Sequence, residues 1–280
     1  MQTFMRHIEA SSCSDTALRN KFSPRVIVEK IDLDSRQVFV AREDLLPGGS
    51  KQRACAFLLT SLVSQGFTEF IYASPFCGFA QVALAYMCSQ LDLRCQIFCE
   101  RQPLNEDESD TDFSKIAQSY GAQIHHVGTL QEAEDHAQRA SLETAGRYKI
   151  PLGFNCVDFR KAYALELSLQ WNIIKSELRH PPKRLWLPVG SGTLASVFSQ
   201  IVDDNTGIKC VDVHVLSSSD ERIIALSKKS NIVLFSARES FREKAAMKPS
   251  IPSNVYYDAK LWQFLLEYAK DGDMWWNVAK

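Results

Sequence analysis

A lysine in a glycine-rich turn is the first residue of this sequence that could carry out chemistry. Gly48 and Gly49 precede Ser50 and Lys51 in the segment 41–54, which reads AREDLLPGGSKQRA. Glycines tolerate the positive φ angles of a tight turn, and a serine can cap the helix that follows. The positive end of a helix dipole disfavours an ammonium group, so we expect the pKa of Lys51 to be low, as an imine-forming amine requires. On this motif alone, a solvated surface lysine is the commoner interpretation.

A second motif, in the segment 185–201, could bind an anion. The buried-type run LWLPV leads into Gly190, Ser191, Gly192 and Thr193 and then directly into an apolar helical pattern. Small residues let the backbone approach a ligand closely, and consecutive N–H groups at a helix N-terminus bind phosphate. The segment has neither the GK[ST] ending of a nucleotide-binding loop nor the GxGxxG pattern of a dinucleotide site. A glycine-rich connection that serves only packing is the alternative.

Together, the two motifs indicate pyridoxal phosphate (PLP), which requires an imine-forming lysine and a phosphate cradle. Their order resembles the fold-type II PLP enzymes related to the tryptophan synthase β chain, and most of all the branch of aminocyclopropane-carboxylate deaminase and D-cysteine desulfhydrase. The resemblance covers most of residues 40–279. Its matched positions are Arg42, Asp44, Gly48, Gly49, Ser50, Lys51 and Arg53 in the lysine motif, and Gly190, Ser191, Gly192 and Thr193 in the phosphate loop.

The resemblance implies roles for further residues. It makes Lys51 the Schiff-base lysine and places the segment from Ser74 to Gly78 beside the cofactor O3′ and the substrate carboxylate, where the family usually has an asparagine. It also places VYYDAKLW (255–262) near the active site. The residues expected to bind the cofactor are Lys51, Gly190, Ser191, Gly192, Thr193 and Cys77, with Ser236 and Glu239 facing the pyridine nitrogen. The residues expected to contact substrate are Ser74, Phe76 and Gly78, and those expected to act in catalysis are Lys51, Tyr256 and Tyr257.

The function implied by the resemblance is a PLP-dependent lyase or deaminase that acts at Cα of a small amino acid. Two alternatives remain open. One is a tailoring enzyme, such as a decarboxylase acting on an aminoacyl group of a modified nucleotide or DNA. The other is a PLP-binding protein without catalysis. A homodimer is also expected from the resemblance.

The elements that must position these motifs alternate between strand-like and helix-like patterns. Such alternation predicts parallel β-α-β units and an α/β protein with helices on both faces of its sheets. We expect two doubly wound domains with the PLP site in the cleft between them: a larger one from residues 1–53 and 156–280, and a smaller one inserted at 54–155. The expected strands are 26–31, 37–41, 70–73, 95–99, 122–127, 185–189, 211–216, 232–235 and 274–279, and the expected helices are 53–65, 79–91, 113–120, 130–147, 159–178, 193–203 and 219–229.

The composition is that of an ordinary globular protein. Of the 280 residues, 45% are hydrophobic and 23% charged, and the formal net charge of −1 gives no general attraction to nucleic acid or lipid. No apolar run is long enough to span a membrane, and Arg6, His7 and Glu9 stand where a signal peptide needs apolar residues. The eight cysteines are irregularly spaced, which favours reduced, buried thiols over disulfides or a metal site. We therefore expect a cytoplasmic protein without a bound metal.

Overall fold

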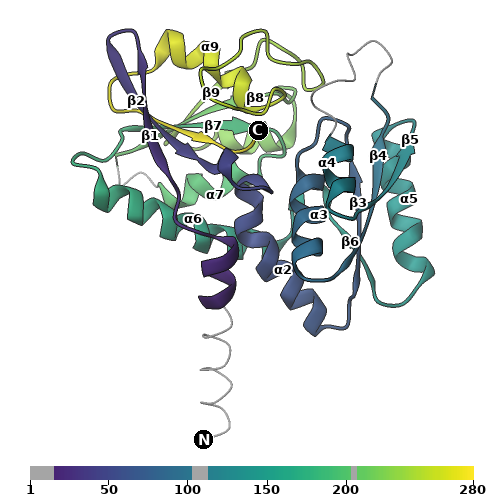
Figure 1. Ribbon diagram of the computed structural model, residues 1–280. Helices are drawn as coiled ribbons and strands as arrows, with labels where there is room; N and C mark the ends of the chain where they lie inside the picture. Colours follow the sequence, from purple (N-terminus) through teal and green to yellow (C-terminus); the bar gives the residue numbers. More distant parts are fainter. Residues whose placement is uncertain (1–15, 103–112, 203–206) are drawn as a thin grey trace, which may run out of the picture.

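The computed structural model describes residues 16–102, 113–202 and 207–280, and these fold into two β-sheets flanked by helices (Figure 1). The polar, acidic composition of segment 105–112 predicts a solvated loop, but the segment lies outside the described residues. All strand pairs but one are parallel. The predicted α/β class with mostly parallel sheets is therefore confirmed.

The larger sheet has the strand order β1-β2-β10-β7-β8-β9. Its strands are β1 (Val28–Leu33), β2 (Arg36–Arg42), β7 (Arg184–Val189), β8 (Lys209–His214), β9 (Ile232–Ser236) and β10 (Met274–Asn277). The hairpin of β1 and β2 is the antiparallel pair, and Asp34 takes a positive φ of 55° in its turn. The strand β10 pairs in parallel with both β2 and β7, so this C-terminal strand joins the β1–β2 hairpin to the other three strands of the sheet.

The smaller sheet has the order β5-β4-β3-β6, all parallel. Its strands are β3 (Glu69–Ser74), β4 (Arg94–Glu100), β5 (Gln123–Val127) and β6 (Arg147–Ile150). The large sheet thus takes its strands from 28–42, 184–236 and 274–277, and the small sheet takes its strands from 69–150 alone. The domain boundaries at 53/54 and 155/156 stay a prediction.

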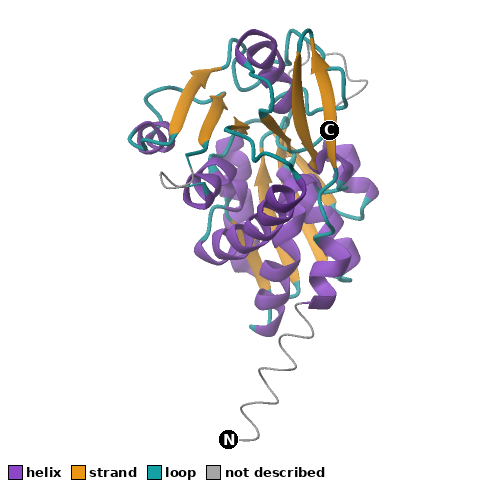
Figure 2. Ribbon diagram, turned by 90° about the vertical axis from the view of Figure 1, so that its left-hand side faces the viewer, coloured by secondary structure: helices purple, strands orange, loops and turns teal. Residues whose placement is uncertain are grey.

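Helices cover both sheets, as a second view shows (Figure 2). A first helix spans 16–22. The others are α2 (Gln52–Ser64), α3 (Ala80–Gln90), α4 (Phe113–Ser119), α5 (Leu130–Glu143), α6 (Val157–Glu177), α7 (Thr193–Ile201), α8 (Glu221–Ser227) and α9 (Asp258–Tyr268), with 3-10 turns η1 (Glu43–Leu45), η2 (Gly49–Lys51) and η3 (Leu152–Phe154). No helix among the described residues is long and apolar enough to cross a membrane.

Three elements differ from the sequence-based expectation, and the first is the helix at 16–22, which had not been predicted. The helix expected over 130–147 ends at Glu143, and β6 follows it. Thr144 is already extended, with φ −140° and ψ 133°, and Gly146 takes a φ of 84° in the turn that leads into β6. The helix α9 had not been predicted, because its first turn coincides with the motif 255–262 that was interpreted only by its resemblance.

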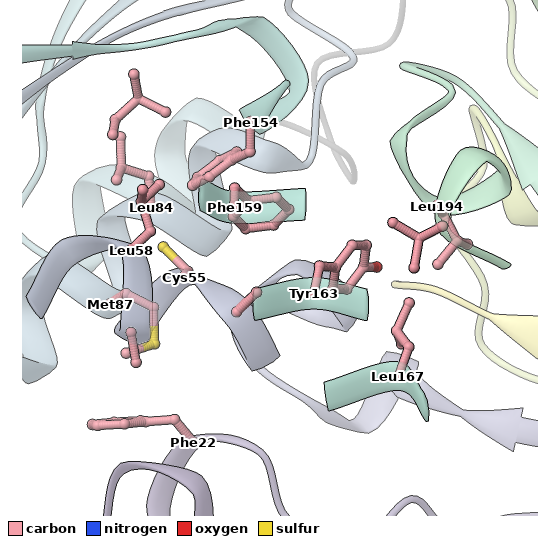
Figure 3. Close-up of a cluster of buried hydrophobic side chains, with 14 of the residues drawn as sticks. Phe22, Cys55, Leu58, Leu84, Met87, Phe154, Phe159, Tyr163, Leu167 and Leu194 are labelled. Carbon is pink, nitrogen blue, oxygen red and sulfur yellow. The ribbon is translucent and has the colours of Figure 1, made fainter. Parts of the chain in front are cut away.

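A central core runs through both sheets and the helices between them. The helices α2 and α6 pack against each other, and the buried cluster around them includes Cys55 and Leu58 of α2 together with Phe159 and Tyr163 of α6 (Figure 3). The same cluster continues to Leu194 at the start of α7. In this core the described cysteines are free thiols, and all but Cys156 are buried.

Candidate active site

The predicted lysine and the predicted phosphate loop line one pocket of about 310 Å³. This volume lies within the range of small-molecule binding sites. Lys51 lines it together with Gly190, Ser191 and Gly192. Two motifs far apart in the sequence, the lysine turn and the glycine loop, therefore line one cavity, as PLP binding requires. Other residues along the pocket wall are Tyr72, Gly78, Phe79, Gly153, Tyr163, Arg222, Phe241, Arg242, Tyr257 and Asp258.

The lysine is presented by a turn that leads into a helix. Lys51 is the last residue of η2 and the N-cap of α2. Gly49 takes a φ of 61°, and a Cβ atom there would lie only 2.6 Å from the Val278 carbonyl oxygen, so a glycine is required. The expected cap by Ser50 was wrong, because neither η2 nor α2 has a side-chain cap. The Ser50 hydroxyl instead accepts a hydrogen bond from Trp276 Nε1 at 3.0 Å, and this bond ties the turn to β10.

The charged residues of the lysine motif form two ion pairs beneath this turn. Arg42 binds both carboxylate oxygens of Asp44 at 2.8 Å. The buried Arg53 binds Glu43 through Nε at 2.7 Å and Nη2 at 2.5 Å, and its Nη1 donates to the Pro24 carbonyl at 2.6 Å. None of these side chains lines the pocket described here. They hold η1 and α2 in place, and so they position Lys51.

The surroundings of Lys51 favour its neutral form. Burial lowers the pKa of Lys51 to about 8, and the nearby Asp258 opposes this shift. Within the described residues, no side chain makes an ion pair or hydrogen bond with Lys51 Nζ. Roughly a tenth of this amine is therefore uncharged at pH 7, far more than for a solvated lysine, in agreement with the predicted direction. The cause that dominates is burial, whereas the sequence had pointed to the helix dipole.

Asp258 is a pocket residue that the sequence analysis did not select. It is fully buried at the start of α9; its Oδ1 accepts a hydrogen bond from the Val278 amide at 2.7 Å, while Oδ2 finds no partner among the described residues. Burial raises the pKa of Asp258 well above its usual range. An unpartnered buried carboxyl oxygen beside a cavity is suited to a ligand's polar group. The signal in the sequence was Asp258's place directly after Tyr257.

The glycine loop joins β7 to α7 and is tightly packed. Gly192 is the N-cap of α7 and takes a φ of 79°. A Cβ atom at Gly190 would lie 2.8 Å from Cε1 of Tyr257, and one at Gly153 would lie 2.5 Å from Ser191 Cβ. The Thr193 hydroxyl donates to the Gly153 carbonyl at 3.2 Å. The turn η3 therefore supports the glycine loop. A side chain at Gly153 or at Gly190 would collide with the neighbouring residue.

The remaining predicted residues differ in their distance from the pocket. Tyr257 and Gly78 line it, but Thr193 and Cys77 do not. Burial raises the pKa of Tyr257 well above its usual value, so its hydroxyl stays protonated. The Cys77 thiol is hydrogen-bonded to Tyr257, and burial raises the pKa of Cys77 to about 12. Cys77 therefore lies next to the pocket wall as a neutral thiol.

The other nominated side chains lie outside the pocket lining. Phe76 and Tyr256 meet edge to face with ring centroids 5.8 Å apart. The Ser74 hydroxyl is bonded to the neighbouring Pro75 carbonyl. Glu239 accepts from the Ala246 amide and from Gln263, and Ser236 ends β9. Of these five, none lines the described pocket, and their assigned roles stay predictions.

The pocket fits the group that the sequence predicted. At one end an amine with a pKa near 8 projects from a helix start. At the other end a loop without bulky side chains leads into the helix α7, whose first N–H groups can bind a phosphate. An aldehyde and a phosphate on one small molecule would satisfy both ends.

Comparison with known proteins agrees with this fit. The family described as pyridoxal-phosphate dependent enzyme matches residues 24–265, so the chain belongs to this PLP-dependent family. A comparison with curated protein sequences found no match.

Solved structures with the same fold include an ACC deaminase homologue, with a TM-score of 0.72 and 14% identity over 95% of this chain and 94% of that chain. A hydrogen sulfide-producing enzyme from Fusobacterium nucleatum has a TM-score of 0.67 and 15% identity over 94% of this chain and 97% of that one. The O-acetylserine dependent cystathionine beta-synthase from Helicobacter pylori has a TM-score of 0.65 and 16% identity over 94% and 95%. At these identities the likeness establishes the fold.

Proposed function

We propose that the chain is a lyase or deaminase that acts at Cα of a small amino acid, with PLP attached as a Schiff base to Lys51. The observation that carries the proposal is the pocket shared by Lys51 and the Gly190–Gly192 loop. Structures with this fold are titled as an ACC deaminase homologue, a hydrogen sulfide-producing enzyme and a fungal L-serine ammonia-lyase.

When bound, PLP supplies an electron sink for the negative charge that develops at Cα. The protein's own groups do the remaining work. The amine of Lys51 can accept and return a proton at Nζ, because its pKa of about 8 leaves both protonation states populated. Tyr257 keeps its hydroxyl proton and can donate a hydrogen bond, since burial raises its pKa. Phe79, Leu152 and Phe241 line the pocket with apolar surface that limits access of water.

The first experiment is a visible spectrum of the purified protein after addition of PLP. We expect an absorption band that borohydride fixes to the protein, and peptide mass spectrometry should place the added mass on Lys51. Lys51→Ala should lose both the band and the added mass. The matched control is Lys161→Ala, because Lys161 is exposed on α6. A wild-type protein that gains no band, or a label on another lysine, would contradict the proposal.

The second candidate is a decarboxylase that acts on an aminoacyl group of a modified nucleotide or DNA. Two arginines, Arg222 and Arg242, line the pocket, and the side chain of Arg242 is 51% exposed. Cations at a pocket wall suit an anionic substrate. Turnover of free amino acids, measured as release of ammonia, pyruvate or sulfide, would support the first candidate. Release of carbon dioxide from aminoacyl nucleotides alone would support the second, and a spectral band that no amine shifts would indicate binding without catalysis.

We also propose that the protein is a homodimer, as the family resemblance implies, and that it is cytoplasmic, as its irregularly spaced cysteines favour. Val157 and Leu165 are 55% and 54% exposed on α6, where they offer apolar surface to a second copy. Light scattering of the eluted protein should give about twice the mass of the chain, 31.7 kDa. A mass that stays at one chain at micromolar concentration would contradict the dimer.

A further inference from the structure

The glycine loop provides no charge of its own. Its members, from Gly190 to Thr193, can offer backbone N–H groups and two hydroxyls, and all of these are neutral. A phosphate monoester carries between one and two negative charges near neutral pH. A cation close to the loop would therefore strengthen the binding of such a group.

Three cationic side chains line the pocket in the part of the chain that the structure describes: Lys51, Arg222 and Arg242. Lys51 is assigned to the aldehyde end. Arg242 follows β9 and is paired with Glu100, with Nη2 2.6 Å from Oε1. Among the described residues no contact connects Arg242 with the loop. Arg222 is therefore the cation that remains as a candidate to bind a group held there.

Arg222 lies directly against the loop. It belongs to the first turn of α8, and a Cβ atom at Gly192 would lie 3.6 Å from its Cβ and 3.7 Å from its Cδ. Its Nη1 lies 3.4 Å from the Ser191 carbonyl oxygen, which makes a long and weak hydrogen bond. Both the aliphatic stem and the guanidinium thus follow the loop on the side of α8.

Asp220 holds this guanidinium in one orientation. Arg222 Nε binds Asp220 Oδ1 at 2.8 Å, and Nη2 binds Oδ2 at 2.7 Å. Asp220 is itself fixed, because its Oδ1 also caps α8 by accepting from the Arg222 amide at 2.9 Å. A guanidinium has five N–H donors in a rigid fork. With Nε and Nη2 bound to Asp220, the Nη1 group keeps a donor for a second anion.

We propose that Arg222 is a ligand of the cofactor phosphate and that its Nη1 closes the side of the Gly190–Thr193 loop that faces α8. The inference rests on the proposed function, which places the PLP phosphate in this loop. Asp220 is a positioning residue: it orients the fork and does not itself contact the cofactor. The arrangement combines neutral backbone donors with one preoriented charge.

The test compares PLP with pyridoxal, which has the same ring and aldehyde but a hydroxymethyl group in place of the phosphate ester. Both are titrated into apoprotein of the wild type and of Arg222→Gln, and the imine band is followed. We expect the variant to bind PLP about tenfold more weakly or worse, the loss of one charge-assisted hydrogen bond, and to bind pyridoxal within about twofold of wild type. The ³¹P resonance of bound PLP should also shift in Arg222→Gln.

Arg242→Gln is the matched control, because it removes a pocket arginine away from the loop; its preference for PLP over pyridoxal should stay at the wild-type value. The inference is overturned if Arg222→Gln keeps that preference, or if pyridoxal weakens as much as PLP. Arg222 is exposed, so the variant should fold, and circular dichroism checks this.

A third variant, Gly190→Val, separates this inference from the proposed function. Its side chain would collide with the Tyr257 ring, where a Cβ atom would lie 2.8 Å from Cε1, so it would distort the loop and should itself lower the preference for PLP over pyridoxal. If Gly190→Val lowers that preference and Arg222→Gln does not, the role of Arg222 alone is refuted. If the wild type shows no preference for PLP over pyridoxal, the phosphate does not bind in the loop, and the proposed function fails with it.

Discussion

Burial moves the pKa values of Lys51 and Asp258 in opposite directions. That of Lys51 falls to about 8, while that of Asp258 rises well above its usual range. In both cases the low dielectric of the pocket disfavours the charged form. Lys51 and Asp258 therefore do not need to form an ion pair in the protein without cofactor. The pKa of Lys51 lies closer to neutral pH than that of a solvated lysine, and this favours the uncharged, nucleophilic form of the amine.

The pKa of Lys51 predicts how cofactor attachment depends on pH. Only the neutral amine attacks an aldehyde, so the rate of PLP attachment should rise with pH and level off above about 8, instead of near the ordinary value of 10.5. Stopped-flow absorbance between about pH 6 and 10 measures this. A rate that keeps rising tenfold per pH unit up to pH 10 would show that Lys51 titrates as a solvated lysine.

Asp212 makes a separate prediction about stability. This residue of β8 is fully buried, neither of its carboxyl oxygens has a partner among the described residues, and burial raises its pKa from 3.8 to about 8. Between these two pH values the folded protein holds a proton that the unfolded chain has lost, so the free energy of unfolding falls as pH rises.

Asp212→Asn removes this ionisation. We expect the variant to exceed the wild type in free energy of unfolding by roughly 2–5 kcal/mol near pH 8, and the difference should shrink toward pH 4. Urea titrations at these two pH values measure it. A difference that does not depend on pH would mean that Asp212 does not carry the raised pKa.

The parts of the site that could be predicted are those encoded by neighbouring residues. Lys51 after two glycines and the run Gly190–Thr193 are local signals, and Lys51 and the first three residues of that run line the pocket. Gly153 gave no such signal, because its role depends on tertiary packing, namely its contact with Ser191. Asp258 was marked only by its place directly after Tyr257. The same limit explains why the resemblance matched Arg42 and Arg53 without giving their role, which is to form ion pairs below the turn.

At the scale of elements, the turn η3 acts as a support for the phosphate loop. Gly153 within it takes a φ of 66°, its amide donates to the Tyr72 hydroxyl at 3.1 Å, and its carbonyl accepts from Thr193. The support therefore comes from the end of the small sheet, while the loop belongs to the large one.

Gly153→Ala should disturb this support. The new methyl group would combine a strained φ with a contact of 2.5 Å to Ser191 Cβ, so we expect a loss of roughly 1–3 kcal/mol in stability and weaker PLP binding. Gly121→Ala is the matched control: Gly121 has a φ of 89° but nothing within 4 Å of the added atom. The control variant should lose stability but keep the wild-type affinity for PLP. Equal PLP affinity in both variants would contradict the role given to η3.

Most elements were predictable because their hydrophobic periodicity is strong. The expected helix over 53–65 is α2, and the expected strand over 185–189 is β7 within one residue. The short strand β6 was absorbed into the preceding helix pattern, since four residues carry little periodicity. The order of strands was beyond the sequence, because β10 reaches its place beside β2 through contacts more than 200 residues apart.

At the scale of the whole molecule, the long segment 237–257 between β9 and α9 connects the two sheets. Arg242 in this segment pairs with Glu100 at the end of β4, and the Cys77 thiol contacts the Phe241 carbonyl. Both contacts lie beside the pocket, which Phe241 and Arg242 line. We therefore expect motion of this segment to change access to the pocket.

Glu100→Gln tests this coupling. Since Arg242 is half exposed, the free energy of unfolding should change by less than about 1 kcal/mol. Amide hydrogen exchange in 237–246 should nevertheless become faster, because the segment loses its charged anchor. Glu143→Gln, which weakens an ion pair to Arg147 within the small sheet, should leave this exchange unchanged. Unaltered exchange in Glu100→Gln would show that other contacts hold the segment.

The position of β10 also has a consequence for biosynthesis. The strand separates β2 from β7 in the finished sheet, so the hairpin made at residues 28–42 has no permanent neighbour until residue 277 leaves the ribosome. At about 5–20 residues per second this wait lasts on the order of 10–50 seconds. The small sheet, whose strands are contiguous, can assemble meanwhile. A nascent chain of this protein should thus depend on chaperones to shield the open edge of β2 from other chains.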